Sequence, residues 1–357
     1  MKRTLFYSVM VSIVILLLAG CATKDKQDFH LVLPPPPEEP RLYFVNVLKG
    51  EVDYVDDSAL DTFIGEEAPS VGKNLFKPYG VAAHKDIVYV TDTARGVVFV
   101  IDDNRSEVRF LGDKPSGKLA LPVSVAIGSD NTVYVSDAKI NKVFGYNKNG
   151  KLVFAIGDSG EFGRPTGIAI NQELNRLYVV DTSKHNIKVF DLKDGKRLFE
   201  FGKRGIKDGE FNYPTNVAID RRNNNVVIVD TQNFRVQTFD KDGNFISKFG
   251  KIGDRPGMFA RPKGIGIDSD GHIYIADSAF NNIQIFDSNG TMLLFFGNAG
   301  FGLGNFYLPA GLYIDEQDKL YAVGSYSGRV QVFQYMNDAW KENNPKKYQK
   351  LKQLQEE

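Results

Sequence analysis

The sequence predicts an all-β fold, a six-bladed β-propeller made of four-stranded antiparallel blades. A proline opens the first strand of each repeat, at positions 78, 122, 165, 214, 262 and 309. An aspartate closes the second strand at positions 92, 137, 181, 230 and 277, and Gly324 occupies the sixth equivalent place. A period of about 40–50 residues with four strands per period is the signature of propeller blades.

One repeat, residues 259–297, illustrates the strands and turns that each blade needs. Its four apolar runs are GIGID, HIYIAD, NIQIFD and TMLLFFG. The tetrads DSDG at 268–271 and DSNG at 287–290 join the runs in pairs. Glycine in such a tetrad supplies the positive φ that a tight turn requires, and β-branched and aromatic runs favour strands. Each repeat is therefore expected to form an antiparallel meander.

The repeats resemble the NHL repeat, which is found in six-bladed propellers. The consensus segments P-x-G-[IV]-A-[IV]-D, [IV]-Y-[IV]-x-D-[ST] and N-x-[IV]-x-[IV]-F-D precede a strand that ends in F-G. The third repeat matches them with PTGIAIN at 165–171, LYVVDT at 177–182, NIKVFD at 186–191 and LFEFG at 198–202. The resemblance extends over residues 41–336 and implies the fold. It does not imply one function, since a fold hosts many activities.

The two ends of the repeat region complement each other. The sixth repeat, which begins at Pro309, supplies three strands but no fourth strand ending in F-G. Residues 41–50, RLYFVNVLKG, form a strand without a repeat of its own. We therefore expect this N-terminal strand to become the outermost strand of the last blade, because closing the ring removes an exposed sheet edge.

The N-terminus has the layout of a secretory signal peptide over residues 1–20. Lys2 and Arg3 precede an apolar run that ends in Leu-Ala-Gly, immediately before Cys21. This ending resembles the bacterial lipoprotein box, which implies that Cys21 is acylated and attaches the protein to a membrane. Ala22, rather than Asp, follows the cysteine. By resemblance to Gram-negative lipoproteins, this predicts a lipid-anchored protein of the cell envelope, on the outer membrane facing the periplasm or the surface.

The remaining segments flank the predicted propeller at 41–336. Residues 21–40 contain four consecutive prolines at 34–37 and are expected to form a stiff tether. Residues 337–357 are charged, with Tyr348, Leu351 and Leu354 at helical spacing, so we expect a short C-terminal helix there.

Composition and cysteine content exclude several functional classes. The chain has 44 basic and 44 acidic residues, so nothing in its charge favours nucleic acid. Its single cysteine cannot form an internal disulfide bond. The four histidines are scattered over the tether and different repeats, and the Asp-rich turns lack the ligand spacing of a calcium loop. We predict no catalytic residues, no metal ligands and no cofactor.

The expected binding surface is the rim formed by the interblade loops and the loops between second and third strands. These loops are rich in arginine and aromatic residues, which protein-binding surfaces favour. The candidate binding residues are Tyr79, Arg95, Lys139, Arg164, Lys184, Tyr213, Arg235, Arg261, Lys263, Phe280, Tyr307 and Arg329.

Two functions are compatible with these features. The first is a non-enzymatic scaffold that binds another envelope protein or a glycan through its loop rim. The alternative is a metal-dependent hydrolase or lyase that uses the central channel, as lactonase-like and amidating-lyase-like propellers do. For that alternative, Asn171, Asn216 and Asp268 are the scattered candidates at the ends of inner strands.

Overall fold

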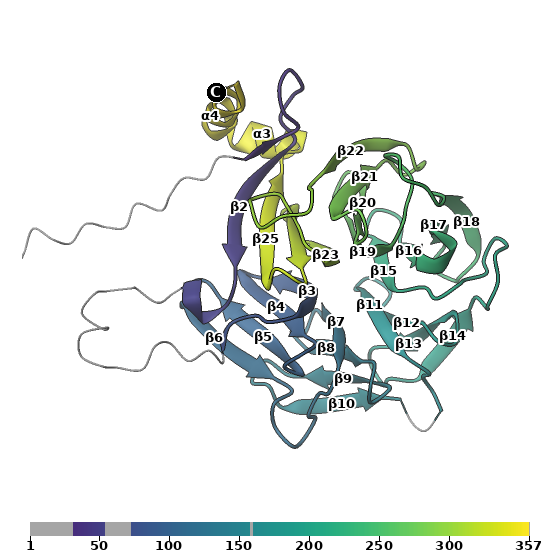
Figure 1. Ribbon diagram of the computed structural model, residues 1–357. Coiled ribbons are helices and arrows are strands. Elements are labelled where there is room, and N and C mark those ends of the chain that lie inside the picture. Colours follow the sequence, from purple (N-terminus) through teal and green to yellow (C-terminus); the bar gives the residue numbers. More distant parts are fainter. Residues whose placement is uncertain (1–30, 54–72, 158–159, 357) are drawn as a thin grey trace, which may run out of the picture. The chain divides into compact units, whose positions relative to one another are not determined.

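The predicted repeats fold into six antiparallel sheets, because each apolar run pairs with the next across a tight turn. The computed structural model describes residues 31–53, 73–157 and 160–356. The first strands of neighbouring sheets contact one another in a closed cycle, from β3 through β7, β11, β15, β19 and β23 back to β3. The predicted six-bladed propeller is thereby confirmed (Figure 1).

Blades one to five each contain four strands that are consecutive in the sequence. Blade one is β3 (Pro78–His84), β4 (Ile87–Asp92), β5 (Val97–Asp102) and β6 (Glu107–Leu111). Blade two is β7 (Pro122–Ile127), β8 (Val133–Asp137), β9 (Lys142–Tyr146) and β10 (Leu152–Ile156). Blade three is β11 (Pro165–Asn171), β12 (Arg176–Asp181), β13 (Asn186–Asp191) and β14 (Arg197–Phe201). Blade four is β15 (Asn216–Asp220), β16 (Asn225–Asp230), β17 (Arg235–Phe239) and β18 (Phe245–Phe249). Blade five is β19 (Pro262–Ile267), β20 (Ile273–Asp277), β21 (Asn282–Phe286) and β22 (Met292–Phe296).

Blade six is built from both ends of the chain. Its sheet has the order β1 (Val32–Leu33), β2 (Leu42–Leu48), β25 (Arg329–Tyr335), β24 (Lys319–Gly324) and β23 (Pro309–Ile314). Short 3₁₀ turns are η1 (Glu51–Asp53) and η3 (Thr231–Asn233), and the helices are α3 (Asp338–Asn343) and α4 (Pro345–Glu356).

The N-terminal strand closes the ring as the sequence predicts. Strand β2 pairs antiparallel with β25, with Leu42 opposite Tyr335 and Leu48 opposite Val330. Figure 1 shows the purple strand β2 beside the yellow strand β25. The seam therefore joins the two ends of the repeat region through a backbone ladder.

The ordered domain extends further toward the N-terminus than the predicted boundary at residue 41. Strand β1 adds a fifth strand to blade six, and Val32 packs with Tyr43, Met336 and Leu351 of α4. Glu39 accepts hydrogen bonds from Tyr348 at 2.6 Å and from Lys352 at 2.7 Å. Residues 31–40 are thus a docking segment for the C-terminal helix rather than part of a tether.

The core lies between the blades. Each of six apolar clusters combines inward-facing side chains of adjacent sheets. Phe211, Phe259 and Phe306, at the ends of three interblade loops, are fully buried. Because these rings anchor the loops in the core, the loops are held in defined positions. No helix of the described segments is long and apolar enough to cross a membrane.

Candidate functional site: the loop face

The aspartates that end the second strands hold two sets of loops at one end of the blades. Asp277 accepts the backbone N–H groups of Ala260 and Arg261 before its blade, and those of Ala279 and Phe280 after β20. Asp92, Asp137 and Asp181 make equivalent contacts on both sides. The interblade loops and the second-to-third-strand loops therefore share one surface, which we call the loop face.

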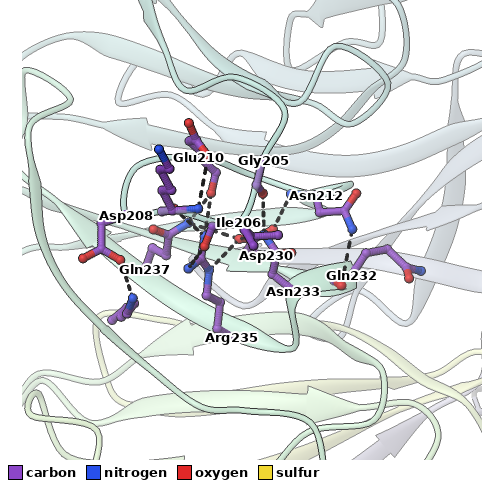
Figure 2. A network of polar contacts seen from close by, with 12 residues as sticks. Gly205, Ile206, Asp208, Glu210, Asn212, Asp230, Gln232, Asn233, Arg235 and Gln237 are labelled. Atoms are coloured by element: carbon purple, nitrogen blue, oxygen red, sulfur yellow. Dashed lines mark hydrogen bonds and ion pairs between the residues drawn. The ribbon is translucent and has the colours of Figure 1, made fainter.

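Two of the predicted binding residues, Arg235 and Arg329, are buried instead. Arg235 is 6% exposed and Arg329 is 8% exposed. Figure 2 shows Arg235 between Asp230 and the carbonyl oxygens of the preceding interblade loop. Five donors in a planar group suit this task, because one guanidinium can hold several carbonyls at once. Both arginines fix a loop from a buried position, whereas the sequence predicts them on the exposed rim.

The other predicted residues lie at or near the loop face with different exposure. Lys139, Arg164, Lys184, Tyr213 and Arg261 are exposed, whereas Tyr79, Arg95, Lys263, Phe280 and Tyr307 are half-buried. The Lys184 ammonium is held by the Gly160 carbonyl at 2.6 Å. The Lys263 ammonium lies 5.3 Å from the centroid of the Tyr79 ring, which joins blades five and one by a cation–π contact.

An exposed aromatic cluster occupies the loop face beside blade six. The ring centroids of Phe301 and Tyr307 are 4.8 Å apart, and those of Tyr307 and Tyr326 are 5.8 Å apart. Phe301 is 60% exposed, Tyr326 is 69% exposed and the neighbouring Leu308 is 48% exposed. Sequence reasoning missed Phe301 and Leu308 as binding candidates, although large apolar residues in a glycine-rich loop were the available signal.

Exposed apolar side chains gather in two zones. Those in the loops at the loop face are Phe76, Ile140, Ile206, Tyr213, Ile252, Phe301, Leu308 and Tyr326. The other zone is the outermost strands, with Val45, Val153, Leu198, Ile246, Leu293 and Phe295. Contiguous exposed apolar surface on a soluble domain marks an interaction site more often than scattered residues do.

The first strands of all six blades surround a central cavity of about 170 Å³. Its wall is mainly aliphatic, with Ser124, Gln172, Asn216, Arg221 and Glu316 among the polar residues that line it. Arg221 reaches from blade four to blade six, where its Nη2 donates to the Asp315 carbonyl at 3.0 Å. This contact links blade four to blade six at the end of their first strands.

The three candidate ligands of the alternative function are not brought together. Asn216 lines the cavity. Asn171 accepts the Leu174 N–H and donates to Asn224, while Asp268 accepts hydrogen bonds from His272 and Tyr274. Within the described ranges, no group of three or more His, Cys, Asp or Glu side chains is arranged to hold a metal ion.

Two histidines have shifted pKa values for different reasons. A hydrogen bond from His272 to Asp268, 2.9 Å long, raises the pKa of His272 above its ordinary value. Burial lowers the pKa of His185, whose Nδ1 accepts the Tyr213 N–H at 3.0 Å. His185 belongs to the loop face, and His272 lies in the turn between the first two strands of blade five, at the other end of the blade.

Comparisons with known proteins agree with the repeat pattern. The sequence model of the Teneurin NHL domain family matches residues 106–306, which is more than half of the chain. Protein brain tumor of Drosophila melanogaster is 29% identical over 119 residues, a region that is 33% of this chain and 11% of that protein.

Solved structures of low sequence identity share the fold. A Bacteroides thetaiotaomicron protein of unknown function has a TM-score of 0.60 at 16% identity, with 81% of this chain and 75% of that chain covered. Virginiamycin B lyase from Staphylococcus aureus has a TM-score of 0.53 at 15% identity, with coverage of 72% and 94%. A gluconolactonase from Xanthomonas campestris has a TM-score of 0.57 at 12% identity, with coverage of 82% and 98%.

Proposed function

Because the chain belongs to the NHL-repeat family of β-propellers, we propose that it is a non-enzymatic scaffold that binds another envelope protein or a glycan. The observation that carries this proposal is the exposed aromatic cluster of Phe301, Tyr307 and Tyr326 on the loop face. Aromatic anchors contribute a large share of the energy at binding surfaces, because they bury a large apolar area. The cluster is also preorganised, because Phe306 anchors its loop in the core.

We further propose that the scaffold is displayed on a membrane through an acylated Cys21. This proposal rests on the Leu-Ala-Gly-Cys ending of the apolar N-terminal run. Cys21 and the signal segment at 1–20 lie outside the described residues. Several acyl chains on one cysteine would hold the protein firmly at a bilayer surface.

The test compares two double variants that each remove two exposed apolar side chains. Phe301→Ser/Tyr326→Ser changes the loop face, whereas Ile246→Ser/Phe295→Ser changes only outermost strands. Each protein is crosslinked on cells and recovered, and the captured protein or glycan is identified. We expect the loop-face variant to lose the partner and the outer-strand variant to keep it.

Equal recovery by both variants would exclude the aromatic cluster as the binding surface. Elemental analysis of the purified protein tests the enzymatic alternative independently of any partner. One tightly held zinc or calcium ion per chain would favour a metal-dependent hydrolase or lyase over the scaffold.

A further inference from the structure

Blades four and six hold their preceding interblade loops in the same way. In each blade the two Nη atoms of an arginine donate to three backbone carbonyls. For Arg235 these are the carbonyls of Ile206, Lys207 and Glu210. For Arg329 they are the carbonyls of Phe301, Gly302 and Asn305.

In both blades, the glutamine two residues after the arginine also binds the preceding interblade loop. Gln237 donates to the Glu210 carbonyl and accepts the Gly209 N–H. Gln331 donates to the Asn305 carbonyl and accepts the Gly304 N–H. The loop contacts of blades four and six can therefore be compared residue by residue.

The difference is one carboxylate. Asp230 pairs in register with Arg235, and Gly324 pairs in register with Arg329. The Asp230 carboxylate accepts hydrogen bonds from Arg235 Nε at 2.8 Å and Gln237 Nε2 at 3.1 Å. It also accepts the Asn212 N–H at 2.7 Å and Asn233 Nδ2 at 2.8 Å. Gly324 has no side chain to take any of these roles.

Blade six keeps the donors although the acceptor is missing. Arg329 is 8% exposed, and no acceptor among the described residues takes a hydrogen bond from its buried Nε. Burial lowers the pKa of Arg329. A buried guanidinium nitrogen without an acceptor costs free energy that a hydrogen-bonded anion would recover.

A second donor is the N–H of Tyr307. In the other five blades, the aspartate accepts the N–H of the residue two positions before the proline, namely Phe76, Ala120, Gly163, Asn212 or Ala260. Tyr307 holds that position before Pro309, and Gly324 offers it no acceptor. A backbone N–H and a guanidinium thus face the place of the same absent carboxylate.

A half-buried serine, Ser327, lies close to Gly324. A Cβ atom built on Gly324 would collide with Ser327 Oγ, which donates to the Gly324 carbonyl at 3.3 Å, so this hydroxyl borders the position of the absent carboxylate. Ser327 is half-buried and occupies the place of Asn233 in blade four, where an amide donates to Asp230. The adjacent Tyr326 and Tyr307 are part of the exposed aromatic cluster. Ser327 is thus a direct chain neighbour of an exposed residue of the loop face.

We propose that this position in blade six is an anion site that binds a carboxylate of a ligand in place of the missing aspartate. Its donors are Arg329 Nε, the Tyr307 N–H and the second N–H of Gln331 Nε2. A planar group with two oxygens and one negative charge matches a donor set that holds an aspartate elsewhere in the same protein. The carboxylate is either a small free acid or an acidic side chain of a bound polypeptide.

The first experiment titrates the full chain with sodium formate and follows the Arg Nε–H signals by NMR. We expect a saturable shift of the Arg329 signal and none of the Arg235 signal, whose carboxylate is already in place. Sodium chloride at equal ionic strength is the control. An unchanged Arg329 signal, or an equal shift with chloride, would overturn the carboxylate site.

The second experiment uses variants that move the carboxylate between blades. Gly324→Asp/Ser327→Asn copies the Asp230 and Asn233 pair into blade six, so formate should no longer shift Arg329. Asp230→Gly should create a second site, so formate should then shift Arg235 and raise the melting temperature of this variant by about 2 °C. A formate response that survives in Gly324→Asp/Ser327→Asn would contradict the proposal.

The source of the carboxylate is distinguished by affinity. If the natural ligand is a small acid, formate or acetate should saturate the site at low millimolar concentration. If the ligand is an acidic side chain, free formate should bind more weakly, and Gly324→Asp/Ser327→Asn should lose the partner captured by the wild-type loop face. The formate titration needs no partner, so the scaffold proposal and this one can fail separately.

Discussion

His272 and His185 illustrate how single residues make the fold sensitive to pH in opposite directions. The pKa of His272 is raised, so its contribution to stability is fully present below the unfolded-state pKa and is lost as the pH rises through the folded-state pKa. The pKa of His185 is lowered, so folding disfavours its protonation and stability falls when the pH drops below the unfolded-state value. Near the ordinary histidine pKa of about 6.5, His272 and His185 therefore change the stability of the fold with pH in opposite directions.

We predict that NMR titration of the imidazole C–H signals will place His272 above the ordinary value and His185 below it. His272→Gln should therefore lower the melting temperature more at pH 6 than at pH 8, because the Asp268 contact is strongest when His272 is charged. If His272→Gln lowered the melting temperature more at pH 8 than at pH 6, the predicted direction of the pH dependence would be wrong. His185→Gln is the companion variant and should reduce the destabilisation that acid causes.

Residue roles on the loop face were harder to predict than residue positions. Arg235 and Arg329 both begin an Arg-Val-Gln segment at the start of a third strand. The segment alone does not tell that this arginine is buried against the preceding interblade loop. The burial of Arg235 depends on the preceding loop curling back, which is seen in the parallel bridge between Arg204 and Phe211. Equivalent bridges join Ile252 to Phe259 and Ala299 to Phe306, so the loop pattern repeats, but it does not tell which neighbouring side chain the loop buries.

At the scale of elements, blade six combines two distant segments, with β1 and β2 from the N-terminal side and β23, β24 and β25 from the last repeat. Strand β2 was predictable, because a fourth strand was missing from the last repeat and an unassigned strand remained at the N-terminus. Strand β1 was not predictable, because two residues followed by four prolines have no detectable strand period. The packing of α4 on β1 through Leu351 and Val32 depends on both ends of the chain meeting.

Three proteins that begin at residues 31, 41 and 51 measure the contribution of each segment. The first retains all described contacts and should be the most stable. The second loses β1 and the Glu39 contacts to α4, which should cost about 2–4 kcal/mol, because burying one apolar side chain is worth about 1.5–3 kcal/mol. The third also loses β2 and should aggregate, because the edge of β25 becomes exposed.

Thermal and urea unfolding measure these differences. Identical midpoints for the first two proteins would mean that β1 and α4 add no stability. A third protein as stable as the second would mean that the ladder between β2 and β25 does not hold the ring closed.

At the scale of the whole molecule, polar contacts between neighbouring blades reinforce the ring at the end opposite the loop face. Asn171 donates to Asn224 at 2.9 Å, which joins blades three and four. Ser269 donates to Asp318 at 2.7 Å, which joins blades five and six. In the described part of the chain, the large exposed apolar side chains that lie in loops are all at the loop face.

The location of the scaffold is tested by Cys21→Ser. If Cys21 is acylated, the wild-type protein should fractionate with the outer membrane and incorporate labelled palmitate. The variant should lose the label and leave the outer-membrane fraction. Cys21 is the only cysteine of the chain, so no other thiol can carry the label. A wild-type protein without label would refute lipid anchoring.

The seam between β2 and β25 also sets the order in which the protein can mature. During synthesis β2 leaves the ribosome before any complete blade, while its partner β25 follows the other five blades. Strand β2 therefore has an unpaired edge until nearly the whole chain has been made. Unpaired strand edges readily pair with the wrong strand. Ring closure is consequently a late step of biogenesis, and a chaperone that shields residues 42–48 would act before it.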